Sequence, residues 1–504
     1  MENALKKLKN IDREIQLLTR TSALLGWDQE TYMPPKGIEG RSEQLALLEG
    51  IIHAKIVNPA TGELFDKLGA SDTFYANNDS LSIIDRSFIK NFFRKYKRTV
   101  CLPEKLVTTM VKESSIAQAV WAEARKKSDF SSFAPNLKTL LELVKEKAER
   151  IGYREHIYDA LIDEFEPWIT TAEIKEVFSG LRTEISDLLK KISVKKEIDD
   201  SFLLKDFPVG DQDVFCREIL GELGWSWDSG RLDLSSHPFS TTIGSGDNRI
   251  TTRYNKDFFK TGIFGCIHEC GHGLYEQGFS DDISDSILGN GASLGIHESQ
   301  SRTWENLIGR SRTFWYYYFD KLKKTFPKQL EGIDLDQFYR AVNKVEPGFI
   351  RVEADEVTYS LHVILRFELE LDLLTGNLAV DDLPEAWNSL SRELFGIVPG
   401  NDSDGVLQDI HWSLGVFGYF PTYALGNLYG AQFYNTLKKE HPDIEDDFAK
   451  GNFSNILNWY REKIHKHGSV YSGGELCKLV TGEKLNSRYY IDYLNSKYSK
   501  IYGE

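Results

Sequence analysis

Apolar residues recur at spacings of three and four through the first part of the chain, for example at Leu5, Leu8, Ile11, Ile15 and Leu18. This spacing places them on one face of a helix, because a helix completes a turn every 3.6 residues. The pattern repeats from residue 1 to about 195, with interruptions at Pro34, Pro35 and Pro103. It predicts a succession of helices that break at these prolines.

The pattern changes between residues 196 and 260. The segment SSHPFSTTIGSGDNRITTRYN has β-branched residues on both sides of the turn-prone residues 244–248. This arrangement predicts a small hairpin. Helical spacing returns at about residue 257, and we expect it to continue to the end of the chain, through KVEPGFIRVEADEVTYSLHVILRFELELDLLTGN, with Gly376 at a helix end.

Composition supports a mainly helical globular protein. Of the 504 residues, 41% are hydrophobic, 27% are charged and only 14 are proline. No repeat or linker divides the chain, so we expect a single unit, residues 1–504. Within it, residues 1–195 form a helical region with lid-like helices, and residues 196–504 carry the hairpin and the candidate site.

Charge and cysteine content exclude several classes of protein. The formal net charge of −15 and the absence of a Lys/Arg cluster argue against a nucleic-acid partner. The first residues lack the apolar core of a signal peptide, and no run of about 18 apolar residues occurs. The five cysteines are odd in number and mostly far apart. We therefore expect a cytoplasmic protein with free thiols and no membrane partner.

The stretch GCIHECGHGL, residues 265–274, contains the pattern His-Glu-x-x-His. On a helix, His268 and His272 lie about 40° apart on one face, whereas Cys266 and Cys270 lie roughly on the opposite face. The two histidines can therefore bind one metal ion that the cysteines cannot reach. In this pattern two imidazoles hold zinc, and Glu269 is placed to reach the water that attacks the substrate.

A catalytic zinc site needs a third protein ligand. The extended metzincin pattern requires Gly at position 275 and His at position 278, but this chain has Tyr275 and Gly278, so that class is excluded. A carboxylate from the following segment, Glu298, can serve instead. His297 is its alternative, and spacing alone does not separate them.

At this point the chain resembles one family, the M32 metallocarboxypeptidases, also called the carboxypeptidase Taq family. The resemblance covers essentially the whole chain, from GWDQETYMPP at 26–35 to GEKLNSRYYIDYL at 482–494. Six blocks between these ends occur in the family's order: His237-Pro238-Phe239, Asp247-Asn248-Arg249-Ile250-Thr251, His268-Glu269-Cys270-Gly271-His272, His297-Glu298-Ser299-Gln300, Ile350-Arg351-Val352-Glu353-Ala354-Asp355 and Gly405-Val406-Leu407-Gln408-Asp409-Ile410-His411-Trp412.

The resemblance implies Glu298, rather than His297, as the third metal ligand. It also implies a mainly α fold of two lobes around a deep groove, similar to neurolysin and angiotensin-converting enzyme, with a small β-sheet beside the zinc helix. One Zn²⁺ per subunit is expected, for which Co²⁺ or Mn²⁺ could substitute. A homodimer is implied as well.

The same resemblance implies a carboxypeptidase that removes single residues from peptides with a free C-terminus. Glu269 is expected to be the general base and acid for the metal-activated water. Tyr423 is the candidate donor to the developing oxyanion, with Tyr419 and His411 as alternatives.

Capture of the substrate's terminal carboxylate requires a cation, for which a guanidinium is well suited. Arg351 is the first candidate and Arg249 the second, and His411 is expected to contribute to the same substrate site. The alternative for Arg351 is an ion pair with Asp355 on one helix.

Three acids, Asp355, Asp409 and Glu305, are candidates to orient a ligand histidine, since zinc-bound imidazoles usually donate their other N–H to an acceptor. Two other functions remain alternatives to a carboxypeptidase. One is a helical oligopeptidase that cuts inside short peptides, and the other is a non-catalytic peptide-binding protein.

Overall fold

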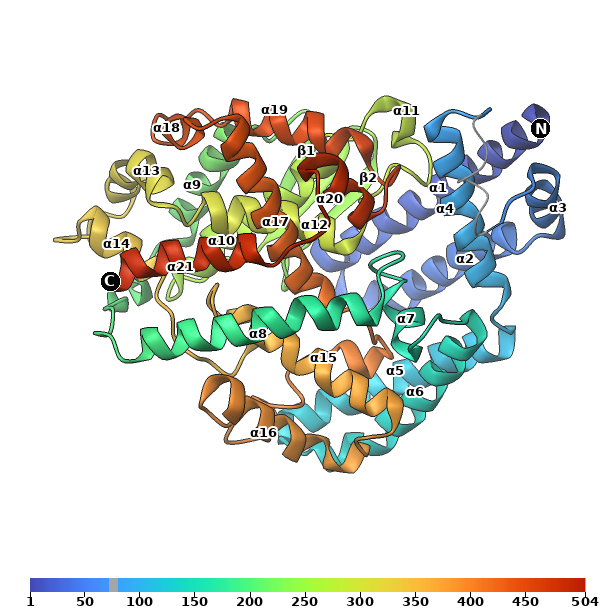
Figure 1. The fold of residues 1–504 in the computed structure, drawn as a ribbon, viewed down its shortest axis with the longest axis horizontal. Helices are drawn as coiled ribbons and strands as arrows, with labels where there is room; N and C mark the ends of the chain where they lie inside the picture. Colours follow the sequence, from blue (N-terminus) through green and yellow to red (C-terminus); the bar gives the residue numbers. More distant parts are fainter. Residues whose placement is uncertain (72–79, 504) are drawn as a thin grey trace.

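Helices make up most of the molecule, as the spacing of apolar residues predicted. A computed structural model describes residues 1–71 and 80–503. The two termini lie at opposite ends of the longest axis (Figure 1). Helix α8 (Thr171–Ser193) crosses the middle of this view, between an upper part that contains the central α10, α12 and α17 and a lower part that contains α5, α6, α15 and α16.

The first helices contribute most of the residues of a separate hydrophobic cluster. They are α1 (Glu2–Thr31), η1 (Pro35–Gly37), α2 (Ile38–Ile56), α3 (Pro59–Leu68) and α4 (Ile83–Val100). Leu8, Ile15, Phe65 and Phe92 are at most 1% exposed in this cluster. The predicted break after α1 is confirmed at Pro34 and Pro35. Ile283, Leu288 and Val470, from later segments of the chain, complete this cluster.

The lower part of Figure 1 continues the helical pattern. Its elements include α5 (Glu104–Lys127), α6 (Phe130–Ile151), α7 (Ile157–Ile162), α15 (Tyr359–Thr375), η6 (Val380–Asp382) and α16 (Leu383–Phe395). Pro103 precedes α5, as predicted. Gly376 ends α15 with φ of 78°, a left-handed conformation that glycine adopts at low cost, which confirms the predicted helix end.

The hairpin is confirmed and belongs to a three-stranded sheet. The strands β2 (Ser240–Gly244) and β3 (Asp247–Thr252) are antiparallel, with Ser240 opposite Ile250. A third strand, β1 (Gly230–Leu234), pairs with β3 in parallel, in the order β1-β3-β2. The hydrophobic pattern did not indicate β1, because a parallel pairing depends on a partner distant in sequence.

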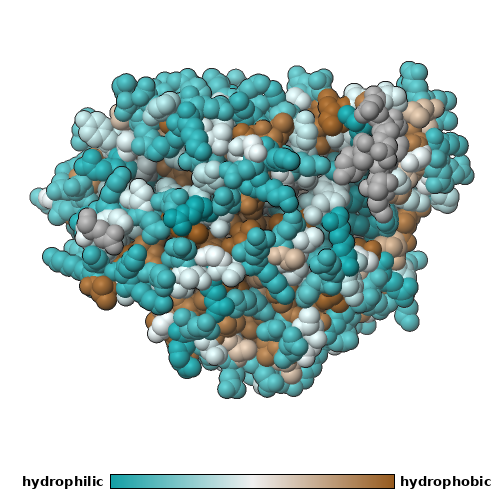
Figure 2. Space-filling view, viewed as in Figure 1, coloured by the Kyte–Doolittle hydropathy of each residue, from teal (hydrophilic) through white to brown (hydrophobic). Residues whose placement is uncertain are grey.

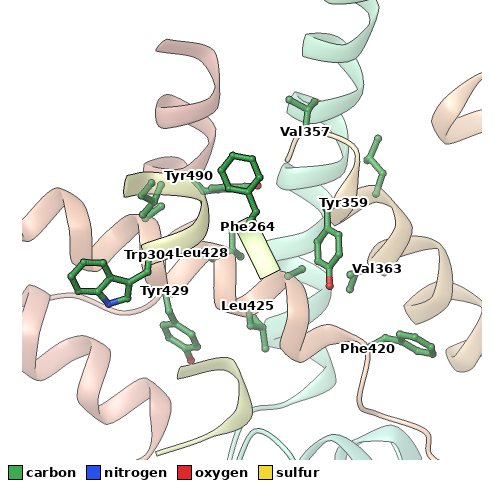
Figure 3. Packing of buried hydrophobic residues seen from close by; sticks show 14 of the residues in the cluster. Phe264, Trp304, Val357, Tyr359, Val363, Phe420, Leu425, Leu428, Tyr429 and Tyr490 are labelled. Atoms are coloured by element: carbon green, nitrogen blue, oxygen red, sulfur yellow. The ribbon is translucent and has the colours of Figure 1, made fainter. Parts of the chain in front are cut away.

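The remaining elements include the central helices and the segments around the sheet. They are η3 (Ser201–Leu204), α9 (Val209–Glu222), α10 (Phe259–Glu276), α11 (Asp281–Ser284), α12 (Leu294–Arg302), the π-helix η4 (Thr303–Ile308), α13 (Arg312–Thr325), α14 (Leu335–Val342), η5 (Arg351–Glu353), η7 (His411–Leu414), α17 (Pro421–Glu440), α18 (Ile444–Phe448), α19 (Ser454–Lys463), η8 (His465–His467), α20 (Gly473–Thr481) and α21 (Arg488–Tyr502). Figure 3 shows Leu425, Leu428 and Tyr429 of α17 within the main core.

Glycines let three central helices approach one another closely. A Cβ on Gly271 of α10 would lie 2.6 Å from the Cα of Ser301 in α12. A Cβ on Gly426 of α17 would lie 2.4 Å from the Cγ of Glu298, also in α12. Because these positions carry no side chain, α12 is held tightly between α10 and α17.

The prediction of continuous helix from residue 257 onwards is wrong between residues 342 and 359 and again between residues 395 and 411. Helix α14 ends at Val342 and α15 begins at Tyr359, with only the short η5 between them. The Asp355 carboxylate accepts hydrogen bonds from the backbone N–H groups of Val357 and Thr358 and from the Thr358 hydroxyl. An acid that satisfies free N–H groups in this way favours a turn at the start of a helix over a helix interior.

Hydrophilic side chains cover most of the face seen in Figure 2, and hydrophobic ones are visible mainly in its middle and lower parts. No helix among the described residues is long and apolar enough to cross a membrane. The five cysteines are free thiols, as predicted.

Candidate metal centre

Helix α10 presents His268 and His272 toward α12, which presents Glu298. The Nε2 atoms of His268 and His272 lie 3.7 and 3.5 Å from Oε2 of Glu298. The three ligand atoms all lie within 4.8 Å of one another. The structure thus brings together the two histidines and the carboxylate that the sequence nominated.

The cysteines of the same helix lie outside this cluster. Cys266 and Cys270 are completely buried in the hydrophobic core. The Sγ of Cys266 lies 3.5 Å from the hydroxyl oxygen of Tyr254. Both thiols therefore point into the packed core, as the helical geometry predicted.

Each histidine has a partner for its second ring nitrogen. The Nδ1 of His268 lies 2.8 Å from Oε2 of Glu305, and the Nδ1 of His272 lies 3.1 Å from the backbone carbonyl oxygen of His297. A carbonyl oxygen can only accept, so His272 carries its proton on Nδ1 and directs the lone pair of Nε2 toward Glu298 and His268. This is the tautomer that a metal ligand requires.

The surroundings of the histidines affect their protonation differently. Burial lowers the pKa of His272 to about 4, so its imidazole is neutral. Burial acts in the same direction on His268, but the charges of Glu298 and Glu305 raise its pKa overall. A carboxylate beside two imidazoles is a donor set that fits a divalent ion such as zinc.

Glu298 is fixed by contacts on both sides. Its Oε1 accepts a hydrogen bond from the Nε of Arg302 at 2.7 Å, and its Oε2 accepts one from the Ser301 hydroxyl at 3.2 Å. Arg302 also donates to Glu305 at 3.2 Å. One guanidinium therefore orients both the nominated ligand and the carboxylate partner of His268. The sequence analysis did not identify Arg302. Its only signal in the sequence is its position four residues after Glu298.

Glu269 lies beside the metal-binding cluster. It is 7% exposed, and burial raises its pKa to about 7. A carboxyl group that titrates near neutral pH can take up a proton and release it again. Its position and its pKa both suit a general base.

A second cluster surrounds Arg351. The Asp409 carboxylate accepts hydrogen bonds from Nη2 of Arg351 at 2.8 Å and from Nε of Arg366 at 2.7 Å. Nη1 of Arg351 donates to the Tyr359 hydroxyl at 3.3 Å. Arg351 is thus paired with Asp409, not with Asp355, and the alternative of a pair on one helix is wrong.

Tyr423 and His411 belong to this second cluster. The Tyr423 hydroxyl lies 3.4 Å from Nε2 of His411, and the Arg351 guanidinium lies 4.6 Å from the centre of the Tyr423 ring. Burial lowers the pKa of His411 to about 4, so its imidazole is neutral. The Tyr419 ring packs edge-to-face against the Tyr423 ring, with the centroids 5.3 Å apart.

Arg302 and Tyr359 connect the two clusters. The Arg302 guanidinium lies 4.2 Å from the centre of the Tyr359 ring, whose hydroxyl meets Arg351. Contacts that run from Glu298 through Arg302 and Tyr359 therefore link the metal-binding residues to the Arg351 cluster. Sequence analysis missed Tyr359 and Arg366, because their roles depend on contacts with distant residues.

Other nominated residues lie elsewhere. His297 is bound to Glu276, with Nε2 3.0 Å from Oε1, and its ring stacks on His272. Arg249 is paired with Asp247 on the sheet and lies over Trp27 of α1, 4.2 Å from the ring centroid. His237 is exposed in the turn before β2. Of the three acids nominated to orient a ligand histidine, only Glu305 contacts one.

Comparisons with known proteins cover the whole chain. The profile of the carboxypeptidase Taq (M32) metallopeptidase family matches residues 7–498. The thermostable carboxypeptidase 1 of Thermus thermophilus is 42% identical over 100% of this chain and 99% of that protein. The carboxypeptidase 1 of Bacillus subtilis is 41% identical over 99% and 98%. The crystal structure of the M32 carboxypeptidase from Deinococcus radiodurans superposes with a TM-score of 0.95 at 36% identity, over 100% of both chains.

Proposed function

Because the chain belongs to the carboxypeptidase Taq (M32) metallopeptidase family and is a metallocarboxypeptidase, we propose that His268, His272 and Glu298 hold its divalent metal and that Glu269 is its general base. The observation that carries this proposal is the convergence of three ligand atoms within 4.8 Å beside a buried glutamate. The substrates are peptides, as befits the family, and they carry a free C-terminus.

Zinc is the proposed ion, because two imidazoles and one carboxylate are a typical donor set of catalytic zinc, although Co²⁺ or Mn²⁺ could occupy the same ligands. Such an ion would supply Lewis acidity toward the scissile carbonyl and toward a water molecule. Arg302 and Glu305 hold the ligands in place before the ion arrives, which reduces the reorganisation that binding requires.

Glu269 accepts a proton from the attacking water and delivers it to the departing amine. Both steps require a carboxyl group that changes its protonation state near neutral pH. The burial that raises the pKa of Glu269 to about 7 provides this property. No other acid is needed for the proton transfer.

Tyr423 stabilises the oxygen that becomes negative during attack on the carbonyl. Its hydroxyl is a donor in a buried site, where hydrogen bonds to developing charge are strong. Neutral His411 accepts or donates at the same hydroxyl and holds it in place. Tyr419 and His411 are the alternative donors.

Arg351 binds the terminal carboxylate of the peptide. Its described hydrogen bonds go to Asp409 and Tyr359 from Nε, Nη1 and Nη2. A guanidinium has about five N–H donors, so two remain for a ligand. Asp409 and Arg366 fix its orientation. Arg249, on the sheet and paired with Asp247, is a second contact for the peptide.

The proposal is tested by hydrolysis of one peptide with a free and with an amidated C-terminus, before and after removal of metal by a chelator. We expect release of the last residue from the free peptide only, loss of this activity with the chelator, and recovery on addition of Zn²⁺. Equal cleavage of the amidated peptide would favour the oligopeptidase alternative. Metal binding without cleavage of either peptide would favour a peptide-binding protein.

Assembly and location complete the proposal. A homodimer follows from the family resemblance, and light scattering after size-exclusion chromatography measures it. A cytoplasmic location follows from five free thiols, which persist in a reducing compartment. Cell fractionation with a tagged full-length chain tests this expectation.

A further inference from the structure

A cavity of about 750 Å³ adjoins the metal-binding residues. Its walls come from α4, from the end of α10 and from the beginning of α12, where its lining includes Ser293, Leu294 and His297. The His297 ring stacks on His272 with the centroids 4.4 Å apart. The cavity therefore begins one side chain away from a nominated metal ligand.

This cavity and Arg351 connect to the metal-binding cluster through different residues. The cavity is reached through His272 and His297. Arg351 is reached through Glu298, Arg302 and Tyr359. A peptide with its terminal carboxylate at Arg351 and its last bond at the metal would therefore extend its preceding residues toward the cavity.

Basic side chains dominate the α4 wall of the cavity. Arg94 and Arg98 share one carboxylate, Asp163, at 2.7 and 2.9 Å. Lys147, across the cavity, is paired with Glu164 at 2.7 Å. With Lys95 there are four cations, against three acids: Asp163, Glu164 and Glu276, the last of which also lines the cavity. This leaves an excess of one positive charge. This excess is local, because the whole chain has a formal net charge of −15.

Lys95 is the cation of this wall that is available to a ligand. Within residues 1–71 and 80–503 its ammonium makes no hydrogen bond and no ion pair. Asp12 and Glu49 influence it only through longer-range charge interaction. Lys95 is partly buried, so its ammonium has lost part of its hydration, and this burial lowers its pKa. A carboxylate that entered the cavity would replace that lost hydration by an ion pair.

We propose that this cavity is a subsite for an acidic side chain in the part of the peptide that precedes the scissile bond, and that Lys95 receives its carboxylate. The inference rests on the proposed function, because the direction of the peptide depends on Arg351. Arg94 and Arg98 strengthen the local positive potential without leaving Asp163. An acidic peptide would otherwise be repelled by the negative charge of the molecule.

The test uses alanine peptides that end in phenylalanine, with one glutamate moved stepwise through the preceding positions, and a matched set with glutamine. At one position we expect kcat/KM to be about five- to tenfold higher with glutamate, because a partly buried ion pair contributes on the order of 1 kcal/mol. The preference should disappear in Lys95→Gln, persist in Lys95→Arg and decrease at high salt.

Lys97→Gln is the matched control, since Lys97 is exposed on the same helix and does not line the cavity. It makes the same change in net charge and should keep the preference. An equal rate for glutamate and glutamine peptides at every position would overturn the subsite. An unchanged preference in Lys95→Gln, or an equal loss in Lys97→Gln, would overturn it as well.

A binding measurement tests the subsite independently of the proposed hydrolysis. The same peptides are titrated by calorimetry into the Glu269→Gln protein, full length and with Zn²⁺, and into its double variant with Lys95→Gln. A glutamate preference that depends on Lys95 supports the subsite even if no peptide were hydrolysed, an outcome that would contradict only the proposed function. Equal affinity for both peptide sets overturns the subsite.

Discussion

The two oxygens of the Glu298 carboxylate have different partners. Oε1 is held by Arg302, while Oε2 faces both histidines. Glu298 would therefore offer a metal ion one oxygen in a fixed position. The same guanidinium binds Glu305, whose other oxygen is contacted by Arg310 at 3.2 Å. Single side chains at this site are positioned by neighbours that the short sequence motif does not contain.

Glu269→Gln should abolish most of the activity and keep the metal. Glutamine has the same shape but cannot accept a proton, and loss of a general base costs about 10²- to 10⁴-fold in rate. We expect kcat to fall by this factor, while zinc content measured by mass spectrometry stays at the wild-type level. Near-wild-type turnover in the metal-loaded variant would remove Glu269 from the mechanism.

Arg351→Ala should reduce kcat/KM for peptides with a free C-terminus by about 10- to 100-fold, since hydrogen bonds to a charged group contribute roughly 1.5 to 3 kcal/mol. Amidated peptides, which lack the carboxylate, should be affected much less. The variant also leaves Asp409 with Arg366 as its remaining guanidinium, so thermal unfolding must be measured beside the kinetics. An equal loss for both kinds of peptide would indicate a structural effect instead.

At the scale of helices, the site depends on how closely α12 approaches α10 and α17. Gly271 and Gly426 permit this approach, because a side chain at either position would overlap with α12. The beginning of α12 is fixed separately by Glu166, whose Oε2 accepts a hydrogen bond from the N–H of Gly295 at 3.1 Å. Glu298 lies between these two contacts, so its position depends on how the helices pack.

Gly426→Ala should weaken metal binding without removing any ligand. The new methyl group would lie 2.4 and 2.6 Å from the side chain of Glu298, so α12 or Glu298 must move. A displacement of a ligand typically costs about 10- to 100-fold in metal affinity, which competition with a chromogenic chelator measures. Gly180→Ala in α8 is the control, because a Cβ there meets nothing within 4 Å. Equal metal affinity in the two variants would show that the close packing does not position Glu298.

At the scale of the whole molecule, the proposed metal joins α10 to α12 and should stabilise the fold. Binding to the native state alone contributes about 4 kcal/mol when the free metal is roughly a thousand times Kd. We expect a chelator to lower the melting temperature of the wild-type protein. It should leave that of a His272→Ala variant unchanged. A chelator effect of equal size in both proteins would contradict the proposed ligands.

Buried acids should make stability depend on pH. Burial raises the pKa of Glu166 to about 7 in the folded protein from an ordinary value of 4.5. A raised pKa means that the stabilising contribution is complete below about pH 4.5 and is lost as the pH rises through 7. Glu166→Gln removes this titration, so the stability of the variant relative to wild type should improve between pH 5 and pH 8.

The size of that change is roughly 1 to 3 kcal/mol, since one pKa unit corresponds to about 1.4 kcal/mol. Urea unfolding of both proteins at the two pH values measures it. The Tyr429 hydroxyl and the Gly295 N–H both donate to the Glu166 carboxyl group, so the variant can also lose a constant amount at every pH. Only the pH-dependent difference tests the raised pKa, and a constant difference would contradict it.

The sequence by itself determined whatever depends on neighbours along the chain. Apolar spacing determined the helices before residue 195, Gly376 ended α15, and the β-branched residues around residues 244–248 formed a hairpin. The spacing of His268 and His272 placed both imidazoles on one face of α10. These features follow from local geometry, which a short segment contains in full.

Tertiary structure decided what depends on distant contacts. Spacing left Glu298 and His297 as equal candidates, and only the folded chain turns one toward the histidines and the other toward Glu276. Asp409 and Tyr359 became partners of Arg351 because the segment before α15 is not helical, which apolar spacing did not reveal. The cavity beside His297 also requires the fold, because α4 and α12 are some 200 residues apart in sequence. Such contacts result from packing of the whole chain, and no local pattern encodes them.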